Sequence, residues 1–169
     1  MRHTFTHPHR CVAGTIGEPG ERAFFIQAAS ENRVISVAVE KAQVQAVANR
    51  LELMIAEVRK ANPLVLIETL PVDDGPLITP VDEEFHVGAI SLAWNDETQL
   101  IAVELYELDD DEDEGEGSVL EINISLGMAA AFVLRSKAVV NAGRLPCPFC
   151  GIPIDPLGHL CPRANGYRR

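Results

Sequence analysis

Runs of alternating apolar and polar residues predict that most of the chain folds into strands. The runs are rich in β-branched side chains and are bounded by turn residues such as glycine, proline and asparagine. They occupy residues 11–16, 23–28, 34–39, 85–94, 100–108 and 119–124. Residues 64–70 are a further candidate strand, whereas residues 1–9 are polar and are predicted to be disordered.

Residues 40–62 carry the clearest helical pattern. Apolar side chains recur there at spacings of three and four positions, which puts them on one face of a helix. These residues are Val44, Val47, Leu51, Met54 and Val58. The helix is predicted to end at Asn62, because the residue before a proline is disfavoured in the helical conformation. A second helix is predicted over residues 125–143, where Gly143 can serve as the C-terminal cap.

The order of these elements predicts an α+β fold. Each half reads as three strands followed by a helix, so the chain contains a candidate βββα duplication in element order, without repeated residue identities. A mainly antiparallel sheet with both helices packed on one face is the economical arrangement. Residues 1–143 are therefore predicted to form one domain that includes an acidic loop at residues 109–117. Residues 144–169 follow it as a separate tail.

Length and composition limit the size and the cellular location expected for this domain. A chain of 169 residues that is 47% hydrophobic has the size and apolar content of one globular domain. No apolar run approaches the roughly 18 residues that cross a bilayer, and the polar N-terminus lacks a signal-peptide pattern. A cytoplasmic location without membrane association is therefore expected.

Charge is unevenly distributed along the chain, whose net charge is −11. Acidic residues outnumber basic ones up to residue 134. In residues 135–169 basic residues are in excess, and Asp155 is the one acidic residue. Repulsion by the acidic part disfavours nucleic-acid binding over most of the surface, so a nucleic acid is expected to bind through the tail alone. The candidate anion- or partner-binding residues are Arg22, Arg144, Arg163, Arg168 and Arg169.

The tail contains the most specific motif of the sequence. Cys147 and Cys150 are separated by two residues in CPFCG, a spacing at which two thiolates reach one metal ion. His159 and Cys161 are separated by one residue, so their side chains face the same side of an extended segment. Structural zinc takes four nitrogen or sulfur ligands in a tetrahedron. The predicted ligands of a structural Zn²⁺ are therefore Cys147, Cys150, His159 and Cys161.

Two alternatives to this ligand set stay open. In the first, His159 donates a hydrogen bond to a thiolate, and Cys11 or a histidine of the N-terminal arm supplies the fourth ligand. In the second, Cys147 and Cys150 form a disulfide or a redox-active pair. The second is disfavoured, because a redox motif normally opens a helix and this pair is followed by prolines.

Three segments carry a resemblance to a known family. VAGTIGEPGERAFFIQA, VEKAQVQAVANRLELMIAEV and AGRLPCPFCGIPIDPLGHLCPRANGYRR resemble an uncharacterised actinobacterial family, named domain of unknown function 3090. The resemblance covers nearly the whole chain and implies a cytoplasmic protein with a C-terminal CPxCG…GHxCPR zinc-knuckle element. It implies no established activity. The family pattern more often has an aromatic residue at Cys11, which argues against Cys11 as a metal ligand.

No catalytic constellation can be read from the sequence, and three functional hypotheses follow. The favoured one is a non-enzymatic binding or adaptor protein whose zinc-stabilised basic tail docks a protein partner. The second is nucleic-acid binding through the same tail. The third is an enzyme acting on a small phosphorylated or nucleotide substrate, for which Arg10 and Arg22 would bind the anion.

Overall fold

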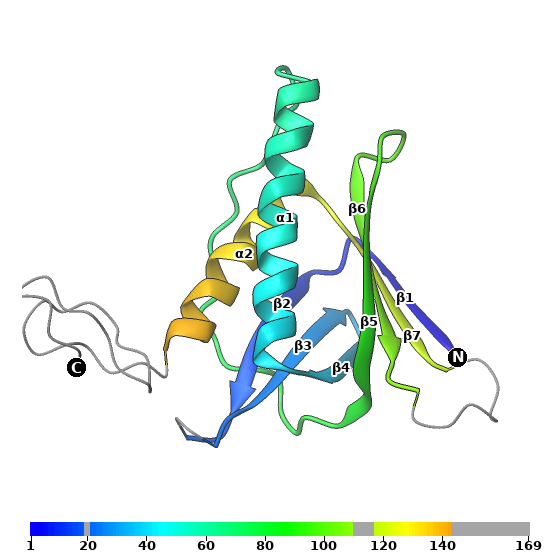
Figure 1. The fold of residues 1–169 in the computed structure, drawn as a ribbon, viewed down its shortest axis with the longest axis vertical. Coiled ribbons are helices and arrows are strands. Elements are labelled where there is room, and N and C mark those ends of the chain that lie inside the picture. The colour runs from blue at the N-terminus through cyan, green and yellow to red at the C-terminus, as the bar shows by residue number, and fades with distance from the viewer. Residues whose placement is uncertain (19–20, 110–116, 143–169) are drawn as a thin grey trace, which may run out of the picture.

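The chain folds into a seven-stranded sheet and two helices (Figure 1). The computed structural model describes residues 1–18, 21–109 and 117–142. The strands are β1 (Arg2–Thr6), β2 (Arg10–Ile16), β3 (Ala23–Ser30), β4 (Arg33–Val39), β5 (Glu83–Asn95), β6 (Leu100–Glu107) and β7 (Val119–Ile124). Helix α1 (Lys41–Ala61) follows β4, and helix α2 (Leu126–Asn141) follows β7. The predicted α+β class is confirmed.

The sheet is mixed, so the prediction of a mainly antiparallel sheet is wrong. Its strand order is β1-β7-β6-β5-β4-β3-β2. The strands joined by hairpins pair antiparallel. In contrast, β1 pairs parallel with β7, and β4 pairs parallel with β5. The second parallel pair arises because α1 and the segment after it form a long crossover between β4 and β5, as parallel neighbours require.

Strand β1 is the element that the apolar pattern did not predict, since residues 1–9 are not disordered. Phe5 is its one buried apolar residue, 2% exposed, so a single aromatic among polar neighbours gives no visible alternation. The guanidinium of Arg33 lies 4.0 Å from the centre of the Phe5 ring and donates to the carbonyl of Thr4. With β1 present, four strands precede α1 and three precede α2, so the element order does not repeat as βββα.

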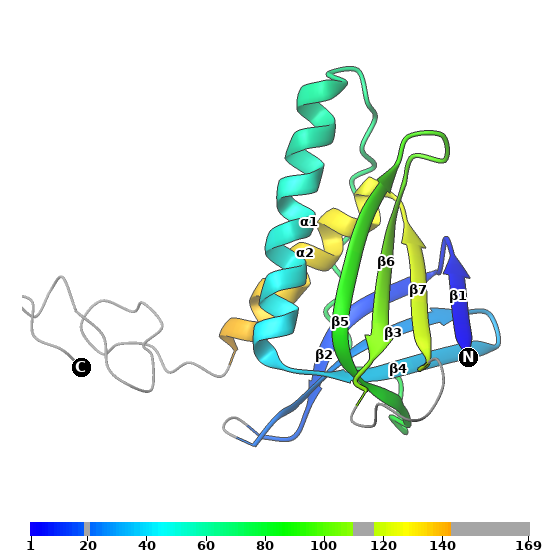
Figure 2. The ribbon, with the colours of Figure 1, turned by 45° about the vertical axis from the view of Figure 1, so that its right-hand side comes forward.

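Both helices lie on one side of the sheet, as predicted (Figure 2). The apolar face predicted for α1 is buried against the sheet. Its first turn is closed by Gln43, whose side-chain oxygen accepts a hydrogen bond from the backbone N–H of Glu40 at 2.7 Å. Helix α2 is capped by Ser125, whose hydroxyl accepts from the N–H of Met128 at 3.2 Å. In the part of the chain described, neither helix combines the length and apolar content that crossing a bilayer requires.

Residues 62–82, called the strap below, connect the end of α1 to the start of β5. The strap runs from the top of α1 past α2 to the bottom of the sheet (Figure 1). Residues 64–70, a candidate strand in the sequence, carry no regular structure. The strap meets the start of α2 at Gly127, where an added Cβ would lie 2.6 Å from the carbonyl oxygen of Glu68. Glycine is needed there because the two backbones approach so closely.

The second half of the strap covers the sheet face opposite the helices. On β2, Ala13 belongs to the core beneath the helices, so Gly14, the next residue, faces the other way. Leu77 packs on Gly14 and is 4% exposed. The side chain of Gln27 on β3 accepts from the N–H of Ile78 at 2.9 Å and donates to its carbonyl at 3.0 Å. The strap therefore bends round the edge of β2 and buries that strand on both faces.

A Gly14→Ala substitution tests this close packing. We expect the free energy of unfolding in urea to fall by about 1–3 kcal/mol, because overpacking a filled site forces neighbouring atoms apart. The added Cβ would lie 2.5 Å from a methyl group of Leu77.

The double variant Gly14→Ala/Leu77→Ala supplies the control. Truncating Leu77 makes room for the new methyl group, so the double variant should be more stable than the sum of the two single effects predicts. Strict additivity would contradict the contact between the strap and β2.

Candidate functional site

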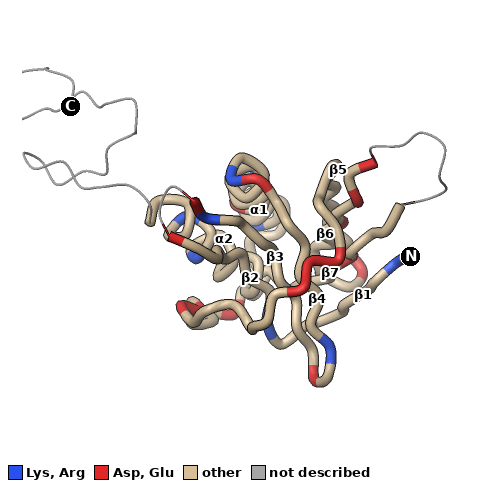
Figure 3. Tube along the Cα trace, turned by 90° about the horizontal axis from the view of Figure 1, so that it is seen from below, with Lys and Arg blue, Asp and Glu red and all other residues tan. Residues whose placement is uncertain are grey.

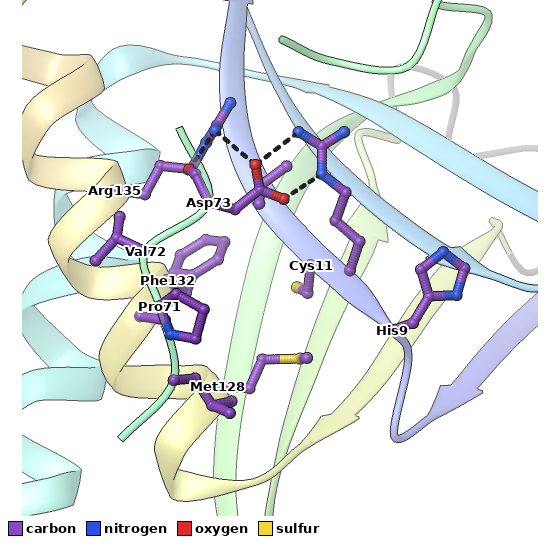
Figure 4. Close-up of a pocket in the computed structure, with 12 residues that line it drawn as sticks. His9, Cys11, Pro71, Val72, Asp73, Met128, Phe132 and Arg135 are labelled. Carbon is purple, nitrogen blue, oxygen red and sulfur yellow. Dashed lines mark hydrogen bonds and ion pairs between the residues drawn. The ribbon is translucent and has the colours of Figure 1, made fainter. Parts of the chain in front are cut away.

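Two arginines and one aspartate meet where the strap passes the edge of β2 (Figure 4). Arg10 begins β2, Asp73 lies in the strap and Arg135 lies in α2. Nε of Arg10 donates to Oδ2 of Asp73 at 2.6 Å, and Nη2 of Arg10 donates to Oδ1 at 3.2 Å. Nη1 of Arg135 lies 3.5 Å from the same Oδ1. One carboxylate is thus shared by two guanidinium groups, and the three residues form the Arg10–Asp73–Arg135 cluster.

The two arginines also bind backbone carbonyls. Nε of Arg135 donates to the carbonyl of Ala13 on β2 at 2.7 Å, and its Nη1 donates to the carbonyl of Asp73. Nη2 of Arg10 donates to the carbonyl of Pro76 in the strap at 2.8 Å. An edge strand exposes a row of backbone groups without partners. The cluster therefore ties the last strand of the sheet, the strap and α2 together.

Burial and hydrogen bonding set the charges of the cluster. The side chains of Arg10 and Arg135 are 14% and 8% exposed. Burial lowers the pKa of the Arg135 guanidinium, while the Asp73 carboxylate beside it acts in the opposite direction. The hydrogen bond from Arg10 holds the pKa of Asp73 below its ordinary value. Because all three groups are ionised near neutral pH, the cluster carries a net positive charge.

A cavity of about 450 Å³ adjoins the cluster between β2, the strap and α2 (Figure 4). Its wall is mostly apolar, and its volume lies in the range of about 300–1,000 Å³ found for small-molecule sites. The apolar lining includes Leu70, Pro71, Val72, Met128, Ala131 and Phe132. The polar lining consists of His9, Cys11 and the cluster itself. This cavity is the candidate functional site of the described residues.

Cys11 lines the cavity as an unreactive thiol. The residue is 6% exposed, and burial raises the pKa of its thiol to about 12. The thiolate is both the nucleophilic and the metal-binding form, so burial works against either role for Cys11. Nδ1 of His9 accepts a hydrogen bond from the N–H of Glu31 at 3.2 Å. The described wall of the cavity therefore offers groups that bind and no activated nucleophile.

Arg22, like Arg10, is a predicted anion-binding residue within the described ranges. Its Nη1 donates to the carbonyl of Val139 at 3.2 Å, near the end of α2, and its guanidinium lies 5.1 Å from the centre of the Phe24 ring. A cation at a helix C-terminus satisfies free carbonyls and complements the helix dipole. Arg22 does not line the cavity. Its contacts are structural, and anion binding by Arg22 stays a prediction.

The predicted metal ligands lie outside the described residues. This holds for Cys147, Cys150, His159 and Cys161, for Arg144, Arg163, Arg168 and Arg169, and for most of the acidic loop. Over residues 1–18, 21–109 and 117–142, no group of three His, Cys, Asp or Glu side chains could hold a metal ion.

Asp73 and Arg135 are the site residues that sequence reasoning missed, whereas Arg10 was named as a candidate anion-binding residue. Arg135 and Asp73 are 62 positions apart, so no local spacing links them. The available signal is an arginine in the apolar run MAAAFVLRS of α2. A charged residue on a helix that is apolar nearly all round is buried and needs an anionic partner.

Fold and site together define an α+β protein with a cationic, mostly apolar cavity at a sheet edge. The chain belongs to a family described as proteins of unknown function (DUF3090), whose sequence profile matches residues 3–161. This confirms the resemblance at the level of the family. Comparison with curated proteins and with solved structures gives no match.

An Asp73→Asn substitution tests the cluster. It leaves two buried guanidiniums without their shared counter-charge, so we expect the free energy of unfolding at pH 7 to fall by about 1–2 kcal/mol. Urea titration measures the loss. Asp74→Asn, an exposed neutralisation at the next position, should change stability by no more than about 0.5 kcal/mol.

The pH dependence of the stability difference between the native chain and Asp73→Asn tests whether the ionised Asp73 carboxylate causes it. The pKa of Asp73 is lowered in the folded state, so its stabilising contribution is present above the unfolded-state value of about 3.9. The contribution is lost as pH falls through the folded-state pKa. The stability gap between the native chain and Asp73→Asn should be constant from about pH 6 to 8 and close only below about pH 4. A gap that closes between pH 6 and 8 would point to another group.

Alkylation of Cys11 tests its buried state. A pKa near 12, against about 8.5 for an ordinary cysteine, lowers the thiolate fraction at pH 8 by about a thousandfold. Iodoacetamide labelling followed by peptide mass spectrometry should find Cys11 unmodified in the native protein and readily modified in urea. Rapid labelling of Cys11 under native conditions would contradict the burial.

Proposed function

We propose that the protein is a non-enzymatic binding protein whose zinc-stabilised basic tail docks a protein partner. Residues 1–143 form the α+β domain in this proposal, and residues 144–169 form the zinc-stabilised tail. The spacing of Cys147, Cys150, His159 and Cys161 carries the proposal, because it supplies the four nitrogen and sulfur ligands of a structural zinc ion. The tail has few apolar side chains, and metal binding can order such a segment in place of a core.

The chemistry of the described residues supports binding over catalysis. In the Arg10–Asp73–Arg135 cluster the charged groups bind one another, and the Cys11 thiol beside them is neutral. The hydrogen bond from Arg22 to Val139 joins the last turns of α2 to β3. The tail therefore follows a helix whose end is anchored to the sheet, which suits a segment presented to a partner.

The charge distribution favours a protein partner over a nucleic acid. Acidic positions outnumber basic ones across the described chain (Figure 3). The tail has the opposite balance, with Arg144, Arg163, Arg168 and Arg169 against Asp155. The acidic domain would repel a nucleic acid that bound beside the tail. A protein with an acidic patch needs to contact the tail alone. A cytoplasmic location, where thiols stay reduced, is part of the proposal.

Elemental analysis of the purified full chain tests the metal. We expect one zinc ion per chain, lost in the Cys147→Ser/Cys150→Ser variant because two of four ligands are removed. Cys11→Ser is the matched control and should keep its zinc. His159→Ala decides the fourth ligand, since a zinc ligand and a hydrogen-bond donor to a thiolate differ in how much metal affinity they contribute. A native chain without zinc, or a Cys11→Ser variant that loses it, would contradict the proposed site.

The same variants test the partner. Affinity capture from native cells should recover a protein equally with the full chain and with Cys11→Ser, and at least ten times less with Cys147→Ser/Cys150→Ser. Equal recovery with all three chains would contradict docking by the tail. Capture that disappears on nuclease treatment would favour the nucleic-acid hypothesis.

A further inference from the structure

The cavity between β2, the strap and α2 has two chemically different ends. The ring of Phe132 and the thioether of Met128 lie along its apolar part, and the guanidinium group of Arg135 lies at the other end beside Asp73 (Figure 4). Arg10 binds the same Asp73 carboxylate. A ligand with an apolar body gains from burial against the first part because it leaves water there. The guanidinium groups of the second part favour a ligand group with a negative charge.

The guanidinium groups have hydrogen-bonding capacity left. An arginine side chain has five N–H donors. For Arg135 the donors on Nε and Nη1 bind protein acceptors, and Nη2 has no acceptor among the described residues. Nη1 of Arg10 likewise has no acceptor among the described residues. The side chain of Arg135 is 8% exposed. An anion at these free donors would replace water with a charged acceptor, which forms the stronger hydrogen bond.

These nitrogens are not sealed inside the protein. Ser136 Oγ is the one fully buried side-chain polar atom without a partner in the part of the chain described. The Nη groups of both arginines therefore border space that solvent enters. Arg10 and Arg135 both line the cavity, so a ligand in it lies beside their side chains.

The carboxylates near this end do not cancel its positive charge. Asp73 is the one carboxylate that lines the cavity, and both its oxygens are held by guanidinium groups. Asp74 acts on Arg135 from the strap, but it is exposed to solvent and does not line the cavity. The lining thus presents two guanidiniums and one paired carboxylate.

We propose that this cavity is a binding site for an amphipathic organic anion, whose apolar body lies against Phe132 and Met128 and whose anionic group binds Arg10 and Arg135. A volume of about 450 Å³ suits a small molecule of this class. All the residues that define this site belong to the described part of the chain, so we expect the Cys147→Ser/Cys150→Ser variant to keep it.

Calorimetry with three probes that share one tail tests the proposal on the full chain. Octanoate, 1-octanol and octylammonium differ in the charge of the head group alone. We expect octanoate to bind at least ten times more tightly than 1-octanol, and octylammonium to bind more weakly than either, because the charged end favours an anion. Equal affinities for the three probes, or no binding of octanoate, would overturn the proposal.

A pair of variants on α2 locates the binding. Ala131→Trp fills the cavity and should lower octanoate affinity at least tenfold. Leu134→Trp changes an exposed position of the same helix, 59% exposed, and should leave the affinity unchanged. Octanoate binding that survives Ala131→Trp would place the ligand elsewhere and overturn the proposal.

The charged end is tested by Arg10→Met, which removes the guanidinium and keeps the apolar stem. Octanoate affinity should fall to that of 1-octanol, while 1-octanol affinity stays the same and reports that the cavity is intact. An unchanged preference for octanoate would exclude recognition by Arg10. If Arg10→Met does not fold, the comparison of Ala131→Trp with Leu134→Trp still decides the proposal.

Discussion

The path of the strap depends on the carboxylate of Asp73, which Arg10 and Arg135 hold from two sides. The chain leaves α1 on the helical side of the sheet, passes the edge strand β2 and reaches β5, which pairs with β4 inside the sheet. The strap makes this passage without regular structure, so its backbone groups need partners from side chains. The two arginines supply them for the strap and for the exposed edge of β2 at once. Buried ion pairs add little net stability, but they fix which segments pack together, and here that determines the path of the strap.

Local signals made every element of this fold except β1 predictable. The apolar spacing of α1 and the proline after it fixed that helix to within a residue at each end, and β7 was predicted at its observed bounds. Long-range pairing has no such signal. Strand β1 has one buried apolar residue, Phe5, and is a strand because β7 offers it an edge. The mixed character of the sheet follows from the parallel pairing of β1 with β7 and of β4 with β5, which the sequence does not show.

The candidate site residues fall into the same two groups, those with a local sequence signal and those that only long-range packing brings together. The zinc motif is read from spacing within the tail, and its four predicted ligands lie outside the described residues, so the metal site stays a prediction. The cavity is built from β2, the strap and α2, and its charged end joins residues more than 60 positions apart. Arg10 was named from the sequence as a candidate anion-binding residue, and the fold places it on the carboxylate of Asp73. The strap therefore creates the candidate cavity as a consequence of where it crosses the sheet edge.

Native-state hydrogen exchange across the strap tests this account most directly. The amide of Gly75 donates to Oδ1 of Asp73 at 3.0 Å, and the amide of Ile78 donates to Gln27. Both amides should be protected in the native chain, and both should lose protection in Asp73→Asn while the amides of β3 keep theirs, because the cluster holds the strap in place. Strap amides that exchange as fast as unstructured peptide in the native chain, or that stay protected without the Asp73 carboxylate, would contradict the account.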